Sequence, residues 1–288
     1  MGTLTLREFL RDYYAPLKGI TDRTCELYEL TIRPFSQFIG HDATLDDLDE
    51  LAIARFLSHR LKTRAAATAA KDRAQLRAMW ELAARKGFVK TWPMVKRIVV
   101  PERIPEAWLT DEMTRLFRAI ESEKGWITGI KASLWWRAIV MLGYQTGERC
   151  GGLLALRWRD ASEAGVVFRA EGRKGRRRDT YREIDRECYE ALAAIRGDRG
   201  PNDTVFPWDK AYTYIWDKLG GILQRAGLPK DRRCKFHKIR RTTASYYEAA
   251  GGSAQQLLDH SSPKVTKAYL DPRIVKSLRA CDAIPKVG

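Results

Sequence analysis

Five polar side chains in this sequence have types and spacings that suit chemistry on a phosphate. His237 and Arg240 stand three positions apart. His260 follows Arg240 by twenty residues and Tyr269 follows it by twenty-nine, while Arg149 lies upstream in a Thr-Gly-Glu-Arg segment. Arginine binds phosphate oxygens with a planar fork of donors, and a tyrosine hydroxyl becomes nucleophilic when cations and a base assist it. Together these residues predict attack by a phenol on a phosphodiester, with imidazoles to move protons.

Each residue also has an ordinary interpretation when taken alone. Arg149 fits a solvated turn, and His237 with Arg240 fits two polar positions on a helix face. His260 fits a loop or a helix cap, and Tyr269 is one of eleven tyrosines and fits a core position. Only their combination and order favour the catalytic interpretation over these alternatives.

The charge of the chain points to a polyanionic partner. Its 288 residues carry 52 Lys and Arg against 36 Asp and Glu, for a net charge of +16. The excess is uneven: residues 1–50 hold 5 basic and 10 acidic side chains, whereas residues 51–100 hold 12 and 2. Positive charge gathered in this way suits a surface that follows a nucleic-acid backbone, and we expect double-stranded DNA as the partner.

Two helices are predicted in the first hundred residues. Residues 68–86 place apolar side chains on one helical face, and Gly87 stands where a helix commonly ends; the inward residues are Leu76, Met79, Trp80 and Ala83. A second helix is predicted over residues 49–61, with its inward side formed by Ile53, Phe56, Leu57 and Leu61. Basic side chains between and beside these faces are the predicted DNA contacts, namely Arg60, Lys62, Arg64, Arg73 and Arg77.

The chain is long enough for two domains that each bury a core. Residues 99–105 contain two prolines without periodicity and are predicted to link an all-α domain over 1–98 to a second domain over 106–288. In the second domain, residues 131–144 form an apolar helix. Residues 166–168 and 179–184 suggest a hairpin. The predicted fold is therefore two-domain and mainly α, with a mixed α+β second domain that contains a small antiparallel sheet.

The order of these motifs resembles the tyrosine recombinases of the phage integrase family. The Thr-Gly-x-Arg ending at Arg149, followed by the Leu-Leu-Ala-Leu-Arg-Trp ending at Trp158, is similar to the family's first conserved segment. The residues from His237 to Tyr269 are similar to its second. The resemblance covers nearly the whole chain, and it implies that the N-terminal helices form a SAM-like core-binding domain.

The resemblance implies a role for each candidate residue. Arg149 and Arg240 would hold the scissile phosphate, and Tyr269 would attack it to form a 3′-phosphotyrosyl link. Lys174, in the predicted hairpin, would protonate the departing 5′ oxygen. His237 would act as base or acid. His260 would hydrogen-bond the phosphate. Arg173 and Arg176, which flank Lys174 in the basic run, are further predicted DNA contacts.

The resemblance also implies how the enzyme works with its partners. Relatives use no metal and no other cofactor, and act as tetramers on paired recombination sites, so we expect the same here, with accessory DNA-bending factors as further partners. A catalytically silent DNA-binding protein on the same scaffold and a type IB topoisomerase-like enzyme remain alternatives. The five cysteines are scattered, and no signal or membrane segment is apparent, which predicts reduced thiols and a cytoplasmic location without membrane association.

Two positions depart from the family pattern. Gly152 stands where an acidic residue usually supports the first arginine, and Asp259 replaces the usual glycine before the second histidine. Because the acidic partner is missing at this position, we predict that Gly152→Glu raises the cleavage rate and leaves DNA affinity nearly unchanged. If the glycine is needed for backbone conformation or close packing, the same change should clash.

Overall fold

The structure is a computed structural model that describes residues 4–173 and 178–276. The chain divides into two compact units, Met1–Arg103 and Ile104–Gly288. The division lies inside the segment predicted as a linker, and residues 89–109 contain no helix or strand. Each unit has its own buried apolar core.

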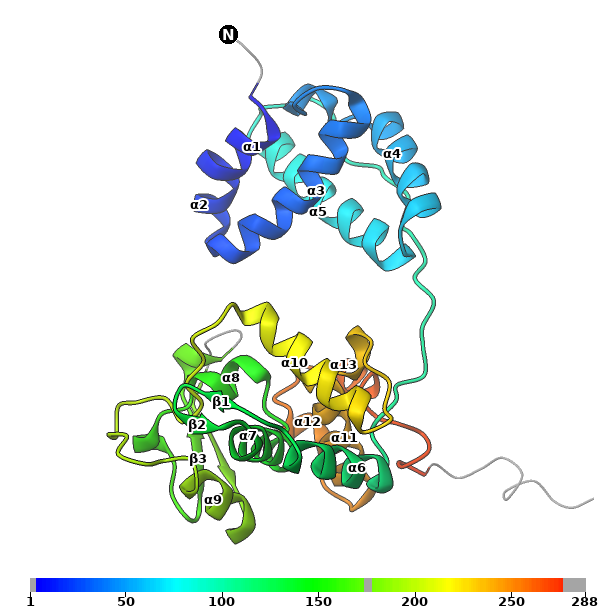
Figure 1. Cartoon of the computed structure of the whole chain (residues 1–288). Coiled ribbons are helices and arrows are strands. Elements are labelled where there is room, and N and C mark those ends of the chain that lie inside the picture. Colours follow the sequence, from blue (N-terminus) through cyan, green and yellow to red (C-terminus); the bar gives the residue numbers. More distant parts are fainter. Residues whose placement is uncertain (1–3, 174–177, 277–288) are drawn as a thin grey trace, which may run out of the picture. The chain divides into compact units, whose positions relative to one another are not determined.

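The N-terminal unit is a bundle of helices (Figure 1). Short helical turns open it, and three longer helices complete it: α1 (Leu6–Phe9), a π-helical turn (Leu10–Tyr14), α2 (Ala15–Lys18), α3 (Asp22–Ile39), α4 (Glu50–Thr63) and α5 (Ala66–Arg85). The prediction for α5 is confirmed, because its four inward residues are all buried and Gly87 has a φ of 76°. In α4 the prediction for Leu61 is wrong. Its side chain is 46% exposed because residues 61–64 at the end of α4 all face solvent.

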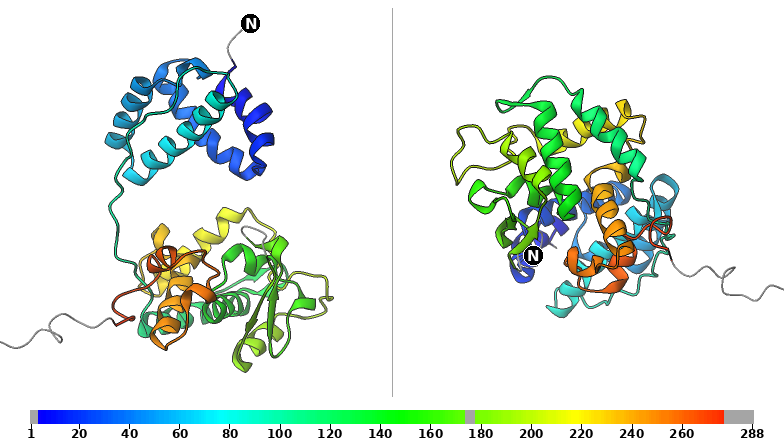
Figure 2. Two further views of the ribbon diagram at one scale, coloured as in Figure 1. Left: turned by 180° about the vertical axis from the view of Figure 1, so that it is seen from behind. Right: turned by 90° about the horizontal axis from the view of Figure 1, so that it is seen from below.

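The C-terminal unit is mainly helical with small antiparallel pairs of strands. Its helices are α6 (Thr110–Glu121), α7 (Ala132–Thr146), α8 (Cys150–Ala155), α9 (Arg186–Ala193), α10 (Tyr212–Arg225), α11 (Phe236–Ala249), α12 (Ala254–Leu257) and α13 (Pro263–Lys267). The predicted apolar helix is α7, which packs against α6, α9 and α11 (Figure 1 and Figure 2). Its apolar residues form the centre of the core because neighbouring helices cover more than one of its faces.

The predicted hairpin is present. Strand β3 (Gly165–Phe168) pairs antiparallel with β4 (Thr180–Glu183), and Phe168 lies opposite Thr180. A second short pair joins β1 (Trp126–Ile127) to β2 (Ile130–Lys131). The predicted fold class is confirmed. Within the described ranges, no helix has the length and apolar character needed to span a membrane.

Candidate active site

The first candidate arginine is placed by a glycine turn at the end of α7. Gly147 ends the helix with a φ of 64°, a left-handed conformation that favours glycine. A Cβ atom here would also lie 3.1 Å from the Leu258 side chain, so the turn packs tightly against the segment that leads to His260. The chain then reverses into α8, with Arg149 at its N-terminal cap.

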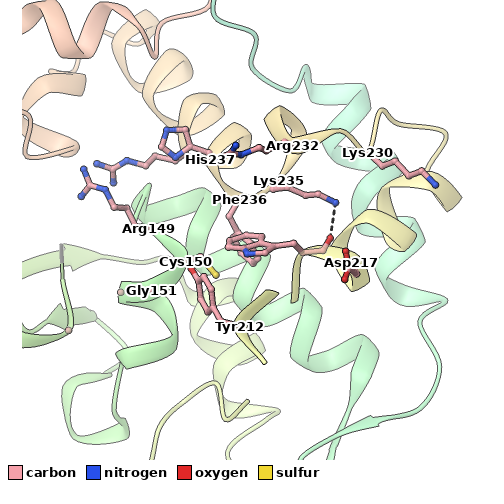
Figure 3. A pocket seen from close by; sticks show the side chains of 14 residues that line it. Arg149, Cys150, Gly151, Tyr212, Asp217, Lys230, Arg232, Lys235, Phe236 and His237 are labelled. Atoms are coloured by element: carbon pink, nitrogen blue, oxygen red, sulfur yellow. Dashed lines mark hydrogen bonds between the residues drawn. The ribbon is translucent and has the colours of Figure 1, made fainter. Parts of the chain in front are cut away.

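The side chain of Arg149 is available for a ligand. It forms no hydrogen bond or ion pair with any residue that the structure describes. It lines a pocket of about 790 Å³, and Figure 3 shows it on the same side of this pocket as His237, with Lys230 at the opposite side. A partly buried cation without an internal partner is suited to bind an anion.

Arg240 is held in place by backbone carbonyls. It lies on α11 with only 2% of its surface exposed, and it donates to the carbonyls of Gly147 and of Leu258, the second at 2.7 Å. A guanidinium has five N–H donors, so these two bonds leave three. Its buried Nε has no partner among the described residues. Burial first, and then the charge of Arg149, lowers the pKa of Arg240 to about 10, so the group stays charged at neutral pH.

The side chains of Tyr269 and His237 form a hydrogen bond with each other. The Tyr269 hydroxyl lies 2.8 Å from His237 Nε2, which joins the segment after α13 to the start of α11. Partial burial, followed by the charges of Arg241 and Arg240, lowers the pKa of His237 to about 4. His237 is therefore neutral near pH 7, and its Nε2 can accept the phenol proton when Nδ1 carries the ring hydrogen.

His260 completes the group around Tyr269. Its Nδ1 lies 3.1 Å from Thr266 Oγ1, and its ring centre lies 4.7 Å from that of Tyr269. Burial, and then the charge of Arg240, lowers its pKa to about 4. Its buried Nε2 finds no hydrogen-bond partner in the described part of the chain. The structure thus brings together five of the six predicted catalytic residues.

The sixth predicted catalytic residue, Lys174, and the predicted DNA contact Arg176 lie outside the described residues. Arg173 is described, and its surroundings do not suit a DNA contact. Its side chain is 8% exposed and is enclosed by Glu148 and Asp259, which use its donors internally. The prediction for Arg173 is corrected accordingly: the residue forms a buried ion network.

A buried carboxylate that the sequence analysis missed lies beside the first arginine. Glu148 Oε1 accepts the backbone N–H of Arg149 at 2.8 Å. A Cβ atom built on Gly152 would lie 2.8 Å from Glu148 Cγ and 3.0 Å from its Oε1. An acidic partner is therefore not missing, and glutamate at position 152 is expected to clash with Glu148 and slow cleavage. The position of Glu148 directly before Arg149 was the one weak indication in the sequence that this carboxylate belongs to the site.

The pocket adds cations that sequence reasoning did not single out. Besides Arg149, His237 and Arg240, its lining includes Lys230, Arg232 and Lys235. All three lie in the dense basic run of residues 230–235, which was the available signal. The positively charged lining of the pocket therefore extends beyond the hydrogen-bonded pair Tyr269 and His237.

The predicted DNA contacts of the N-terminal unit differ in their surroundings. Arg60 pairs with the buried Asp72 at 2.8 Å, and Arg73 donates to the backbone carbonyls of Val95 and Lys96. The remaining three are Arg77, which lies 3.7 Å from Glu81, and Lys62 and Arg64, whose exposed side chains have no internal partner in the described ranges.

Comparison with known proteins identifies the class of protein. A family model described as the phage integrase family matches residues 108–274. An integrase of Enterobacteria phage 434 is 25% identical over 94% of this chain and 77% of its own length. A tyrosine recombinase XerC of Pelobacter propionicus is 23% identical over 93% of this chain and 91% of its own length.

Solved structures show the same fold. A lambda integrase dimer bound to a COC′ core site has a TM-score of 0.73 and 20% identity, covering 96% of this chain and 99% of that one. The Tn1549 transposon integrase bound to circular intermediate DNA has a TM-score of 0.71 and 13% identity, with 98% of each chain covered. The chain belongs to the phage integrase family and is a tyrosine-type site-specific DNA recombinase. The silent-protein and topoisomerase-like alternatives are disfavoured.

Proposed function

We propose that this recombinase binds double-stranded DNA at specific sites and cuts each strand with Tyr269. The observation that carries the assignment is the 2.8 Å contact between the Tyr269 hydroxyl and His237 Nε2. Arg149 and Arg240 supply positive charge that stabilises the negatively charged transition state at phosphorus. Such charge matters because phosphoryl transfer depends on positioning and on electrostatic stabilisation.

In the proposed cleavage step the phosphate is transferred from the 5′ oxygen of the DNA to Tyr269. The Tyr269 oxygen forms a bond to phosphorus, and its proton passes to His237 Nε2. The bond from phosphorus to the 5′ oxygen breaks, which leaves a 3′-phosphotyrosyl link and a 5′ hydroxyl once that oxygen is protonated. The proton donor is assigned to Lys174 by resemblance. Reversal of the step by a 5′ hydroxyl from another strand rejoins the DNA and releases Tyr269.

The phosphate oxygens have candidate donors in three side chains. Counting only the described residues as partners, Arg149 has a free guanidinium, Arg240 has three remaining N–H groups and His260 has an unpaired buried Nε2. His260 can donate from Nε2 when Nδ1 accepts from the Thr266 hydroxyl. A phosphate here would add negative charge among the arginines, which would raise the pKa of His237 and make it a stronger base.

The assembly is proposed from a structural neighbour. One solved structure is a lambda integrase tetramer bound to a Holliday junction, with a TM-score of 0.71 to this chain. We infer that this chain also acts as a tetramer on paired sites. The need for accessory DNA-bending factors, the cytoplasmic location and the domain limits at residues 98 and 106 stay predictions.

A direct test begins with selection of the bound DNA from a random pool. Two copies of the selected site are then placed on one supercoiled plasmid, with a single-site plasmid beside it. The proposal predicts deleted or inverted products from the two-site plasmid only. Relaxation of both plasmids without recombinant products would instead support a topoisomerase-like activity.

Neutralising Lys62 or Arg64 is expected to weaken DNA binding without loss of stability. Each change should reduce the slope of log affinity against log salt by roughly one, because one phosphate contact is lost. Arg60→Gln is the matched control from the same helix. It removes one of the two cations that pair with the buried Asp72, the other being Lys71, and should lower the melting temperature instead. Salt titrations that give parallel lines for wild type, Lys62→Gln and Arg64→Gln would place this surface away from DNA.

A further inference from the structure

A buried ion network lies beside the candidate active site. Arg173 is at its centre, donating to Glu148 Oε2 from Nε at 3.0 Å and to Asp259 Oδ2 from Nη2 at 2.6 Å. The three side chains are 8%, 3% and 15% exposed for Arg173, Glu148 and Asp259. Charges this well buried and mutually bonded interact more strongly than exposed ion pairs do.

The network joins three segments that are far apart in the sequence. Glu148 immediately precedes Arg149 and accepts its backbone N–H, so its carboxylate is fixed from both sides. Asp259 immediately precedes His260. Arg173 follows β3 and reaches both carboxylates with one guanidinium. A shift of either carboxylate segment would therefore break its bond to Arg173, and a shift of the Arg173 segment would break both bonds.

Gly152 makes room for the Glu148 carboxylate. It lies within α8 and is not among the residues with positive φ, so the backbone does not require glycine there. A Cβ atom would instead press on Glu148 Cγ at 2.8 Å, whereas one on the neighbouring Gly151 would meet nothing within 4 Å. The small residue at 152 is thus explained by the buried acid beside it.

Asp259 has an unusual backbone that its side chain stabilises. Its φ is 51°, in the left-handed region that non-glycine residues seldom adopt. Its carboxylate accepts from Arg173, from Arg178 at 2.5 Å and from Arg182 at 3.4 Å. A strained residue at a functional site persists when its surroundings determine its conformation in this way.

We propose that Glu148, Arg173 and Asp259 form a carboxylate clamp that positions Arg149 and His260 for the phosphate. They are positioning residues, because they act through Arg149 and His260 and do not themselves bind the phosphate. The inference rests on the proposed function of Arg149 and His260. Preorganised donors stabilise a transition state most when they need not move during reaction, so a loosened clamp slows cleavage more than it weakens DNA binding.

The test compares Glu148→Gln, Asp259→Asn and the double variant in single-turnover cleavage of a nicked suicide substrate. Both changes keep the shape of the side chain and remove its charge, and asparagine tolerates the left-handed backbone. Each single variant is expected to cleave roughly 10- to 100-fold more slowly, the size of effect that small misplacements produce. Because the two carboxylates share the Arg173 guanidinium, the double variant should be slowed by less than the product of the two single effects.

The matched control is Asp179→Asn. Asp179 is a carboxylate on the same hairpin that pairs with Arg169 at 2.8 Å, outside the clamp. This variant should cleave at the wild-type rate. DNA affinity and melting temperature are measured for every variant, so that a slow but fully folded and DNA-bound enzyme is recognised.

A second test moves the carboxylate from position 148 to position 152, so that it measures a recovery of the cleavage rate as well as a loss. Glu148→Ala removes the carboxylate, and adding Gly152→Glu returns one to the same space. The combination should cleave faster than either single change, because the two changes relieve each other's defect. The clamp would be overturned if the single variants cleaved at the wild-type rate, or if their cleavage rates fell only in proportion to a lowered melting temperature. It would also be overturned if the rate effects of two combined changes were simply the product of the single effects. Absence of an adduct from the wild-type enzyme would defeat the proposed function instead.

Discussion

Tyr269→Phe is expected to bind its DNA site normally and to form no covalent protein–DNA adduct. The change removes only the hydroxyl, and the ring keeps its contacts with His237 and His260. No other atom at this position can attack phosphorus, so the loss should be complete rather than partial. A denaturing gel with a labelled, nicked substrate measures the adduct, and a mobility shift on the same DNA measures binding.

Tyr247→Phe is the matched control for this experiment. Tyr247 is a tyrosine on α11 that is 47% exposed, and the same single hydroxyl is removed. Its adduct yield should equal that of the wild type. An adduct that persists in Tyr269→Phe and disappears in Tyr247→Phe or Tyr246→Phe would move the nucleophile to that residue.

Arg149→Ala is expected to lower the cleavage rate by about 10²- to 10³-fold, the cost of removing one preorganised donor group from a charged transition state. Its melting temperature should hardly change, because the side chain has no internal partner among the described residues. Arg149→Lys should recover only part of the rate, since lysine restores the charge without the planar fork. Single-turnover rates with a thermal melt of each variant provide the measurement.

Two results would count against this role of Arg149. If Arg149→Ala cleaves at the wild-type rate, the phosphate is held elsewhere in the pocket, with the basic residues around Arg232 the next candidates. If Arg149→Lys is as fast as the wild type, the fork geometry has no importance and only the charge matters.

The fold could be predicted where local patterns determine it. The apolar face of α5 and the turn at Gly87 follow from helical periodicity and glycine conformation, and both are found. Leu61 shows the limit of this reasoning. It continues the apolar face of α4, but periodicity does not tell whether another element covers the last turn, and here the turn is exposed.

The candidate site was predictable for residues whose type and spacing carry chemistry. His237, Arg240 and Tyr269 were found in this way. Arg173 was misassigned because a charge in a basic run is usually solvated, and only the folded chain shows that Glu148 and Asp259 enclose it. Such networks join residues that are 25 and 86 positions apart, a relation that no local pattern contains.

Cleavage by this recombinase should leave Tyr269 covalently attached to DNA. The most direct measurement traps the wild-type enzyme on a nicked suicide substrate, digests protein and DNA, and locates the nucleotide-bearing peptide by mass spectrometry. We predict a single modified residue, Tyr269, joined to a 3′ phosphate. A nucleotide on any other side chain, or a link to a 5′ phosphate, would contradict it.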